Sequence, residues 1–360
     1  MSVTNALMRR GTELAVTHMS SDKPEHQQAN GGLVALFGIT ALLIVVAFWS
    51  IEYTYGMVIA TLAVVEDTNP DIYVRITSDI DPTKPANDQE DPELVASTPA
   101  KPITSKLRTT VKHLRSRAGF WSRFRGMGMF MAYNVVQGFF ASFFPASSYL
   151  LQFIVRATLG VLLATWQMAW VHIVISEPSP KRFYQRIPSY KTWSKIAPAA
   201  ILQDVLTTAA FFVPMSIAKF AGWLEVPADQ DVPSMVAMCR FVGASAIPAI
   251  LAFLIAMPAR VIFIRVAASM LPEEDETIVP FDRSFGGKVH PAITGGSGKI
   301  GLMDAWTTFD WAARVRFAKV IGKTFAMQVA LAIFSTLVIG VQVFFLFKTA
   351  KPVDSNAPGI

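Results

Sequence analysis

The 360-residue sequence has little charge and almost no cysteine: 16% of its residues are Asp, Glu, Lys or Arg, and Cys239 is its single cysteine. One cysteine excludes an intramolecular disulfide framework. Soluble globular domains usually carry about 25% charged residues, so the composition argues against an ordinary soluble domain.

Motifs for chemistry are also scarce. The five histidines have no metal-ligand spacing, and no Gly-x-Ser-x-Gly or similar nucleophile motif occurs. The glycine-rich run 296–301 has Ile300 after Lys299, where a phosphate-binding loop has Ser or Thr. The sequence therefore predicts no enzyme, no metal site and no cofactor.

Long apolar segments dominate what is present. Hydrophobic residues make up 52% of the chain, and the mean hydropathy is +0.41. Segments of this length and character are typical of membrane-spanning helices. The predicted fold is an all-α bundle of six transmembrane helices, at residues 31–51, 127–144, 148–175, 199–224, 235–257 and 322–347.

The polar segments define the remaining organisation. A disordered N-terminal tail is expected over 1–30, the transmembrane bundle over 31–347 and a short C-terminal tail over 348–360. Large loops at 66–126, 176–198 and 258–321 alternate with short connections, which is also compatible with three helix-pair repeats. The alternation places the large loops on one side of the membrane.

The large loops contain basic segments with aromatic residues among the bases. The clearest is in the first loop, where Phe120, Trp121 and Phe124 surround Arg123 and no acid follows Glu93 before Glu177. This composition predicts amphipathic loop helices against anionic lipid rather than nucleic acid. The net charge of +6 then reflects the positive-inside rule, with the loops in the cytosol or the mitochondrial matrix.

Polar side chains inside the predicted spans are the strongest functional signal. On a straight helix, Gln152, Arg156 and Gln167 share one face of the third span. We expect these and other buried polar residues to line a central pathway that binds a polar or anionic solute. The alternative is structural: Arg156 pairs with Asp204, and the amides bond neighbouring helices. The candidate substrate-binding residues are Gln152, Arg156, Gln167, Asp204, Arg240, Gln328 and Gln342.

Two resemblances bear on the fold. The segment from Leu271 to Arg283 resembles uncharacterised fungal multi-pass membrane proteins, which implies no known activity. More weakly, three helix pairs with long loops resemble the mitochondrial carrier family, as do the segments 118–126 and 303–306. The proline–acid–base mark of that family is absent, because Pro258 is followed by Arg260 where the acid belongs.

Two functions follow from these patterns. The first is a solute transporter or carrier-like protein for a polar or anionic small molecule. The alternative is a non-transporting scaffold that contacts anionic lipid or protein partners through its basic loop helices. Either would be an integral protein of the mitochondrial inner membrane, an endomembrane or the plasma membrane. The solute, the organelle and the oligomeric state are left open.

Overall fold

A computed structural model describes residues 27–28, 31–67, 102–223, 244, 247–248, 250–289, 296–349 and 351–352. The chain divides into two compact units: Met1–Ile51 with Phe325–Ile360, and Glu52–Thr324. Regular structure in the described residues is helical, apart from one antiparallel pairing of two-residue strands, β1 (Gln27–Gln28) and β2 (Lys351–Pro352). The predicted all-α class is confirmed.

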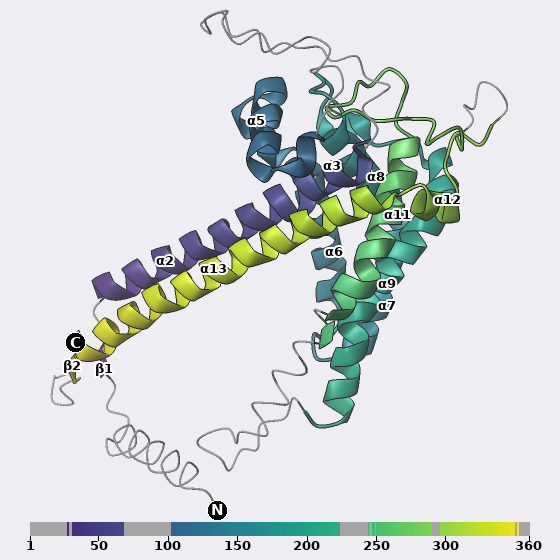
Figure 1. Ribbon diagram of the computed structural model, residues 1–360. Coiled ribbons are helices and arrows are strands. Elements are labelled where there is room, and N and C mark those ends of the chain that lie inside the picture. The colour runs from purple at the N-terminus through teal and green to yellow at the C-terminus, as the bar shows by residue number, and fades with distance from the viewer. Residues whose placement is uncertain are drawn as a thin grey trace, which may run out of the picture. The chain divides into compact units, whose positions relative to one another are not determined.

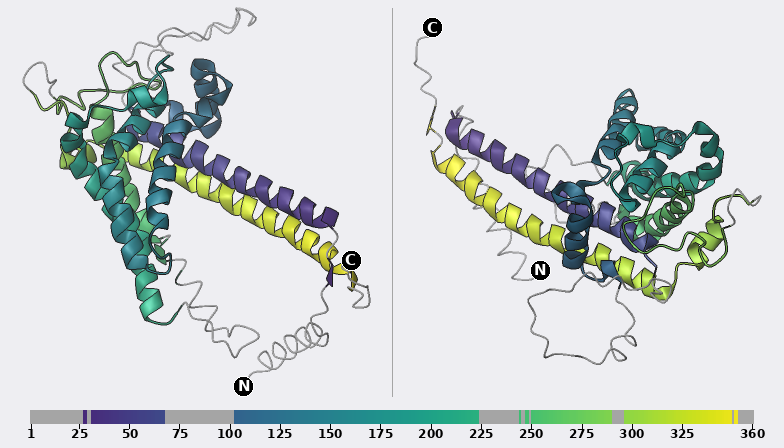
Figure 2. Two further views of the ribbon diagram at one scale, coloured as in Figure 1. Left: turned by 180° about the vertical axis from the view of Figure 1, so that it is seen from behind. Right: turned by 90° about the horizontal axis from the view of Figure 1, so that it is seen from above.

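The first unit is a pair of apolar helices. α2 (Gly31–Ile51) lies beside the part of α13 (Trp311–Thr349) that starts at Phe325 (Figures 1 and 2). α2 buries none of its residues, and Leu42 and Leu43 are each 63% exposed. Exposed apolar surfaces of this size mark contact with lipid or with another protein.

Three helices in the described ranges are long and apolar enough to cross a membrane: Gly31–Val65, Tyr190–Phe220 and Trp311–Leu346. The helices of the third predicted span add a fourth if their bent pair, with an angle of 61° between its halves, counts as one span. These helices indicate a membrane protein. The predicted second span forms a helix of only 16 residues, and much of 235–257 lies outside the described residues, so the count of six stays a prediction.

The second unit contains the remaining helices (Figure 1). The bounds of its α-helices are α3 (Ala60–Val65), α5 (Leu107–Ala118), α6 (Met127–Ser142), α7 (Tyr149–Leu162), α8 (Ala164–Ile175), α9 (Trp193–Phe220), α11 (Met257–Ser269) and α12 (Leu302–Thr307). Its π- and 3₁₀-helical segments are η1 (Glu52–Ile59), η3 (Ile103–Ser105), η4 (Phe120–Phe124), η5 (Phe183–Arg186), η6 (Tyr190–Thr192) and η7 (Ala252–Ala256). The unit also includes the start of α13.

The core of this unit lies where α3, α8 and α11 pack against one another in pairs. The first loop helix, α5, covers this core because Leu107, Val111, Leu114 and Ala118 recur at helical spacing and face it. The predicted amphipathic character of that helix agrees with the structure.

Gly126, just before α6, lies against the Trp170 ring. It has a φ of 72°, and a Cβ added to it would lie 2.8 Å from that ring. The position therefore has no room for a side chain.

The third predicted loop, 258–321, differs from the structure in two ways. Its beginning is helical in α11, and Ile278, Val279 and Phe281 pack into the core. The aromatic and basic residues over 303–321 predict one amphipathic helix, but the helix is interrupted after α12, and α13 then runs from Trp311 without a further break. The sequence interpretation missed a helix start at Asp310, whose carboxylate accepts a hydrogen bond from Ala313 N at 3.1 Å.

Basic side chains satisfy the carbonyl groups at the ends of the core helices. Arg265 donates to Val64 O at 3.1 Å, and Arg316 donates to Glu66 O at 2.7 Å, both at the end of α3. Arg125 donates to Ile173 O at 3.0 Å and to Ser176 O at the end of α8. Helix C-terminal carbonyls otherwise lack partners and favour positive charge, so these contacts hold the helix ends together.

Arg125 and His172 are therefore structural residues. Burial, and then the nearby Arg186, lowers the pKa of Arg125 to about 10, so the guanidinium stays charged at neutral pH. The position of His172 near the end of the third predicted span predicts an interfacial side chain, but the residue is buried and lies 2.8 Å from Ala267 O near the end of α11. Burial was not visible in the sequence, because it depends on loops that return to cover these groups.

Glu66 joins the first loop to this end of the core. Only 4% of the residue is exposed, and its carboxylate accepts hydrogen bonds from Ile103 N at 2.5 Å, Thr104 N at 3.0 Å and the Thr104 hydroxyl. Arg316 Nε lies 3.9 Å from the same carboxylate. A buried carboxylate with three donors and a cation is satisfied only as long as it is charged.

We expect Glu66→Gln to lower the free energy of unfolding by about 3 kcal/mol, because the amide cannot replace a charged acceptor among buried donors. The matched control is Glu177→Gln, since Glu177 pairs with Arg117 at 3.1 Å in an exposed ion pair. Such pairs contribute about 0–1 kcal/mol. Thermal unfolding of the two purified variants in detergent measures the effect. Equal losses of unfolding free energy in Glu66→Gln and Glu177→Gln would contradict the assigned role of Glu66.

Candidate functional site

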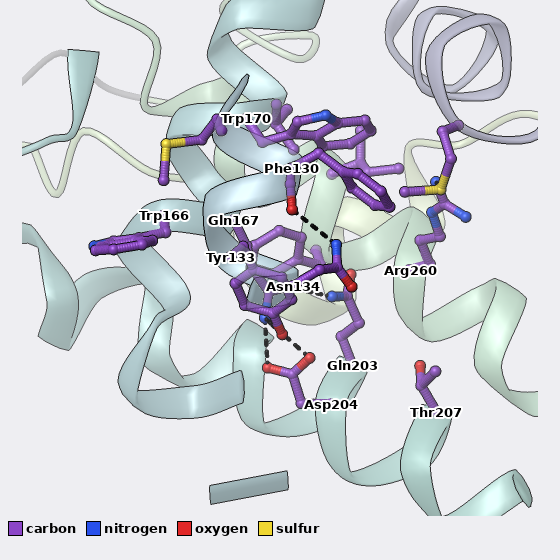
Figure 3. A pocket seen from close by; sticks show the side chains of 15 residues that line it. Phe130, Tyr133, Asn134, Trp166, Gln167, Trp170, Gln203, Asp204, Thr207 and Arg260 are labelled. Carbon is purple, nitrogen blue, oxygen red and sulfur yellow. Dashed lines mark hydrogen bonds between the residues drawn. The ribbon is translucent and has the colours of Figure 1, made fainter. Parts of the chain in front are cut away.

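A cavity of about 210 Å³ lies within the second unit, between α6, α8, α9 and α11. We call it the inner cavity; Figure 3 shows its lining side chains. Its walls are largely aromatic, with Phe130, Tyr133, Trp166, Trp170 and Phe263. Its other apolar lining residues are Met57, Met129, Val171 and Ile264, and its polar ones are Asn134, Gln167, Gln203, Asp204, Thr207 and Arg260.

Asp204 is the carboxylate of this cavity. It lies near the middle of the apolar stretch Tyr190–Phe220 and is 8% exposed. Gln167 Nε2 lies 2.9 and 3.1 Å from its two oxygens, and Gln203 Nε2 donates to Gln167 Oε1 at 2.6 Å. Figure 3 shows Gln167 above the Asp204 carboxylate. The second amide fixes the orientation of the first, so that an N–H group faces the carboxylate.

The predicted ion pair between Arg156 and Asp204 is not among the interactions of the described residues. Asp204 is held by amides, whereas the Arg156 guanidinium lies 6.0 Å from the centre of the Phe212 ring and its buried Nε has no hydrogen-bond partner there. The helix break at Leu163 explains the difference. Because α7 and α8 meet at 61°, residues that share a face on a straight helix point into different spaces.

A second cavity, of about 770 Å³, opens at the turn between α6 and α7. We call it the hairpin cavity; Gln152, Arg156, Tyr149, Phe211 and Phe212 are among its lining residues. Gln152 donates to Ala141 O at 3.2 Å and Phe144 O at 3.0 Å. It therefore closes the end of α6, and its amide N–H groups serve the hairpin itself.

Hydrogen bonds connect the two cavities. In the inner cavity, Gln167 Nε2 lies 3.0 Å from the Tyr133 hydroxyl, which also accepts from Gln137 Nε2 at 2.7 Å. Gln137 Nε2 lies 3.4 Å from the backbone carbonyl of Arg156, whose side chain lines the hairpin cavity. We call this series from Asp204 to Arg156 the polar chain.

The other three predicted site residues do not join this chain in the described structure. Gln342 belongs to the first unit and donates to the Thr40 hydroxyl at 2.8 Å, linking α13 to α2. Gln328 lies in the same unit and has interactions of its own. Arg240 lies outside the described residues. Gln152, Arg156, Gln167 and Asp204 are thus the predicted residues that the second unit places around its two cavities.

Sequence reasoning missed several residues of the inner cavity. Tyr133 was not selected, although Tyr133 and Gln137 are four residues apart in an apolar segment and face the same side of a helix. Gln203 was passed over beside Asp204, and Arg260 was expected on an apolar helix that continues the fifth span but was not selected as a site residue. The aromatic walls carried no signal, because aromatic residues are common in any apolar core.

Comparison with known proteins finds no matching family model, no matching curated protein and no matching solved structure. The resemblances to fungal multi-pass proteins and to mitochondrial carriers therefore stay predictions.

A close approach of α7 and α9 positions Asp204. A Cβ on Gly160 would lie 2.6 Å from Asp204 Cγ and 3.0 Å from its Cβ. We expect Gly160→Ala to lower the free energy of unfolding by about 1–3 kcal/mol, because α7 and α9 would have to separate. Thermal unfolding in detergent measures the effect.

Gly138→Ala is the matched control for that substitution. Gly138 also lies in a helix, α6, but no atom lies within 4 Å of a Cβ added there. Alanine favours a helix over glycine by about 1 kcal/mol, so this variant should unfold at the same or a higher temperature. Similar losses of stability in Gly160→Ala and Gly138→Ala would show that Gly160 has no special packing role.

Proposed function

We propose that this chain is an integral membrane protein that binds a small polar solute in the inner cavity and carries it across the bilayer. The observation that supports this function is the polar chain inside an apolar bundle. A charge held at mid-depth in a membrane costs at least about 2.5 kcal/mol, and retained charges usually mark a solute or ion pathway. Asp204 is such a charge, and it faces a cavity rather than a cationic partner.

The six-span, three-pair plan is part of the proposal. It is supported by a similar order of elements in each third of the chain, since η1 leads into α3, α7 bends into α8, and η7 leads into α11. Each of these three segments is followed by further helical segments, and the last of these in each case is a longer helix: α6, α9 and α13. The packing of α3, α8 and α11 in pairs gives the three parts a common centre.

A carrier exposes its binding site to water, first on one side and then on the other. In a Cys239→Ser background, we expect Gln203→Cys to react with a charged, membrane-impermeant thiosulfonate applied to either side of oriented vesicles. Gln203 lines the inner cavity. Mass spectrometry of the purified protein measures the modified fraction.

The matched control is Ile201→Cys, which lies two residues earlier in α9 and is 48% exposed away from the cavity lining. At about 100° per residue, the two positions are on opposite faces at nearly the same depth. Ile201→Cys should stay unmodified because lipid covers it. An unreactive Gln203→Cys, or reaction from one side only, would contradict a carrier.

A second candidate function is a scaffold that contacts anionic lipid. It is favoured by one surface, formed by the outer face of α5 with η4. On this α5–η4 surface, Trp121 is 72% and Phe120 58% exposed, and the Arg115 and Arg123 guanidinium carbons lie 5.1 and 5.7 Å from the Phe120 ring centre. Exposed aromatics beside bases suit the headgroup region, and α6 begins directly after them.

This second function predicts a lipid-dependent stability. We expect phosphatidylserine in mixed micelles to raise the unfolding temperature of the protein, since each base near an anionic surface contributes about 1 kcal/mol. Replacing Lys106, Arg108, Lys112, Arg115 and Arg123 with Gln should remove most of that rise. Arg125 stays unchanged because it is a buried structural residue.

Phosphatidylcholine, which has no net charge, is the control lipid, and Lys288→Gln is the control variant on another exposed base. Both should leave the response to phosphatidylserine as it is in the parent protein. An equal rise in the five-residue variant would argue against lipid binding by the α5–η4 surface.

A further inference from the structure

The polar side chains of the inner cavity use their hydrogen-bond donors within the protein more than their acceptors. Asn134 donates its side-chain N–H to Phe130 O at 2.8 Å, and Gln203 donates to Gln167 at 2.6 Å. Gln167 in turn donates hydrogen bonds to Asp204 and to the Tyr133 hydroxyl. Asn134 and Gln203 each use one of their two N–H groups in this way, whereas their side-chain oxygens accept no hydrogen bond from the described residues and can act as acceptors toward a ligand.

The charged residues near the inner cavity also bear on which ligand it can bind. Asp204 on α9 shares the inner cavity with Tyr133 of α6 and Arg260 of α11. Arg156 lines the hairpin cavity and makes no ion pair with Asp204 among the described residues. Arg260 directs Nη2 to Met57 Sδ at 2.8 Å, and it interacts electrostatically with the Glu52 carboxylate. Asp204 therefore presents a negative charge that neutral amides orient but do not neutralise.

The aromatic walls of the inner cavity also favour a cationic ligand. The faces of Trp and Tyr rings attract cations, and cages of such rings recognise organic ammonium groups. A cavity of about 210 Å³ has room for roughly seven waters at about 30 Å³ each, which fits a small molecule with one ring. An apolar body with a cationic end would use both the rings and the carboxylate.

We propose that the inner cavity binds a small organic ammonium compound, with its protonated amine at Asp204 and its apolar part against Phe130, Trp166 and Trp170. This inference rests on the proposed function and names the chemical class of its solute. Simple amines and amino acids share the ammonium group; an amino acid would add a carboxylate for which Arg260 is the available cation.

Isothermal titration of the full-length protein in detergent tests the inference with matched probes. 2-Phenylethylamine is the cation, 3-phenylpropionate the anion, 2-phenylethanol the neutral compound and phenylalanine the zwitterion. We expect 2-phenylethylamine to bind about tenfold or more tightly than 3-phenylpropionate and 2-phenylethanol. Phenylalanine binding more tightly than 2-phenylethylamine would identify an amino acid as the source of the ammonium; weaker binding would identify a simple amine.

Asp204→Asn keeps the shape of the side chain and removes its charge. This variant should lose the preference for 2-phenylethylamine but still bind 2-phenylethanol, which shows that the cavity is intact. Glu274→Gln removes one charge from an exposed side chain, 75% accessible, and should change nothing. Preferred binding of 3-phenylpropionate, no binding of the amine, or an unchanged preference in Asp204→Asn would overturn the inference.

Failure here is separable from failure of the proposed function. A water-accessible Gln203→Cys with no ammonium preference would leave a carrier for another solute. An inaccessible Gln203→Cys would reject the carrier itself, whichever probe binds to the protein in detergent.

Discussion

The second unit depends on the contacts between buried or partly buried basic side chains and the carbonyl groups at the ends of α3, α8 and α11. Arg265 and Arg316 serve the end of α3, Arg125 serves the end of α8, and His172 reaches Ala267 O near the end of α11. Each helix end would otherwise bury unpaired carbonyls, which cost free energy comparable to a lost hydrogen bond. By binding groups on neighbouring segments, these side chains also fix the helices relative to one another.

The basic side chains of the predicted loops therefore have two separate roles. Buried arginines hold the core end, and the exposed ones, with Phe120 and Trp121, form the α5–η4 surface. Net charge alone cannot separate these tasks, because an arginine contributes the same charge in either place. What separates them is the partner: a backbone carbonyl at a helix end, or an aromatic ring open to its surroundings.

The inner cavity lies in the part of the unit where helix regularity breaks. α7 and α8 meet at 61°, which turns Gln167 toward Asp204 while Arg156 stays at the hairpin cavity. The bend converts what would be one polar face into two sites, connected through Tyr133 and Gln137. An apolar bundle can hold such a chain only because each member bonds the next, since lipid offers no replacement partner.

The sequence by itself determined the all-α class and the apolar helices, and it selected Gln167 and Asp204 as polar residues inside those helices, because hydrophobicity and helical spacing are local properties. It also selected Arg156 and Gln152 inside the third predicted span, but placed both on one face together with Gln167. Only the tertiary structure decided which groups meet. The bend at Leu163, the burial of Arg125 and His172, and the meeting of Tyr133 with Gln167 depend on segments far apart in the chain, whose packing no local pattern encodes.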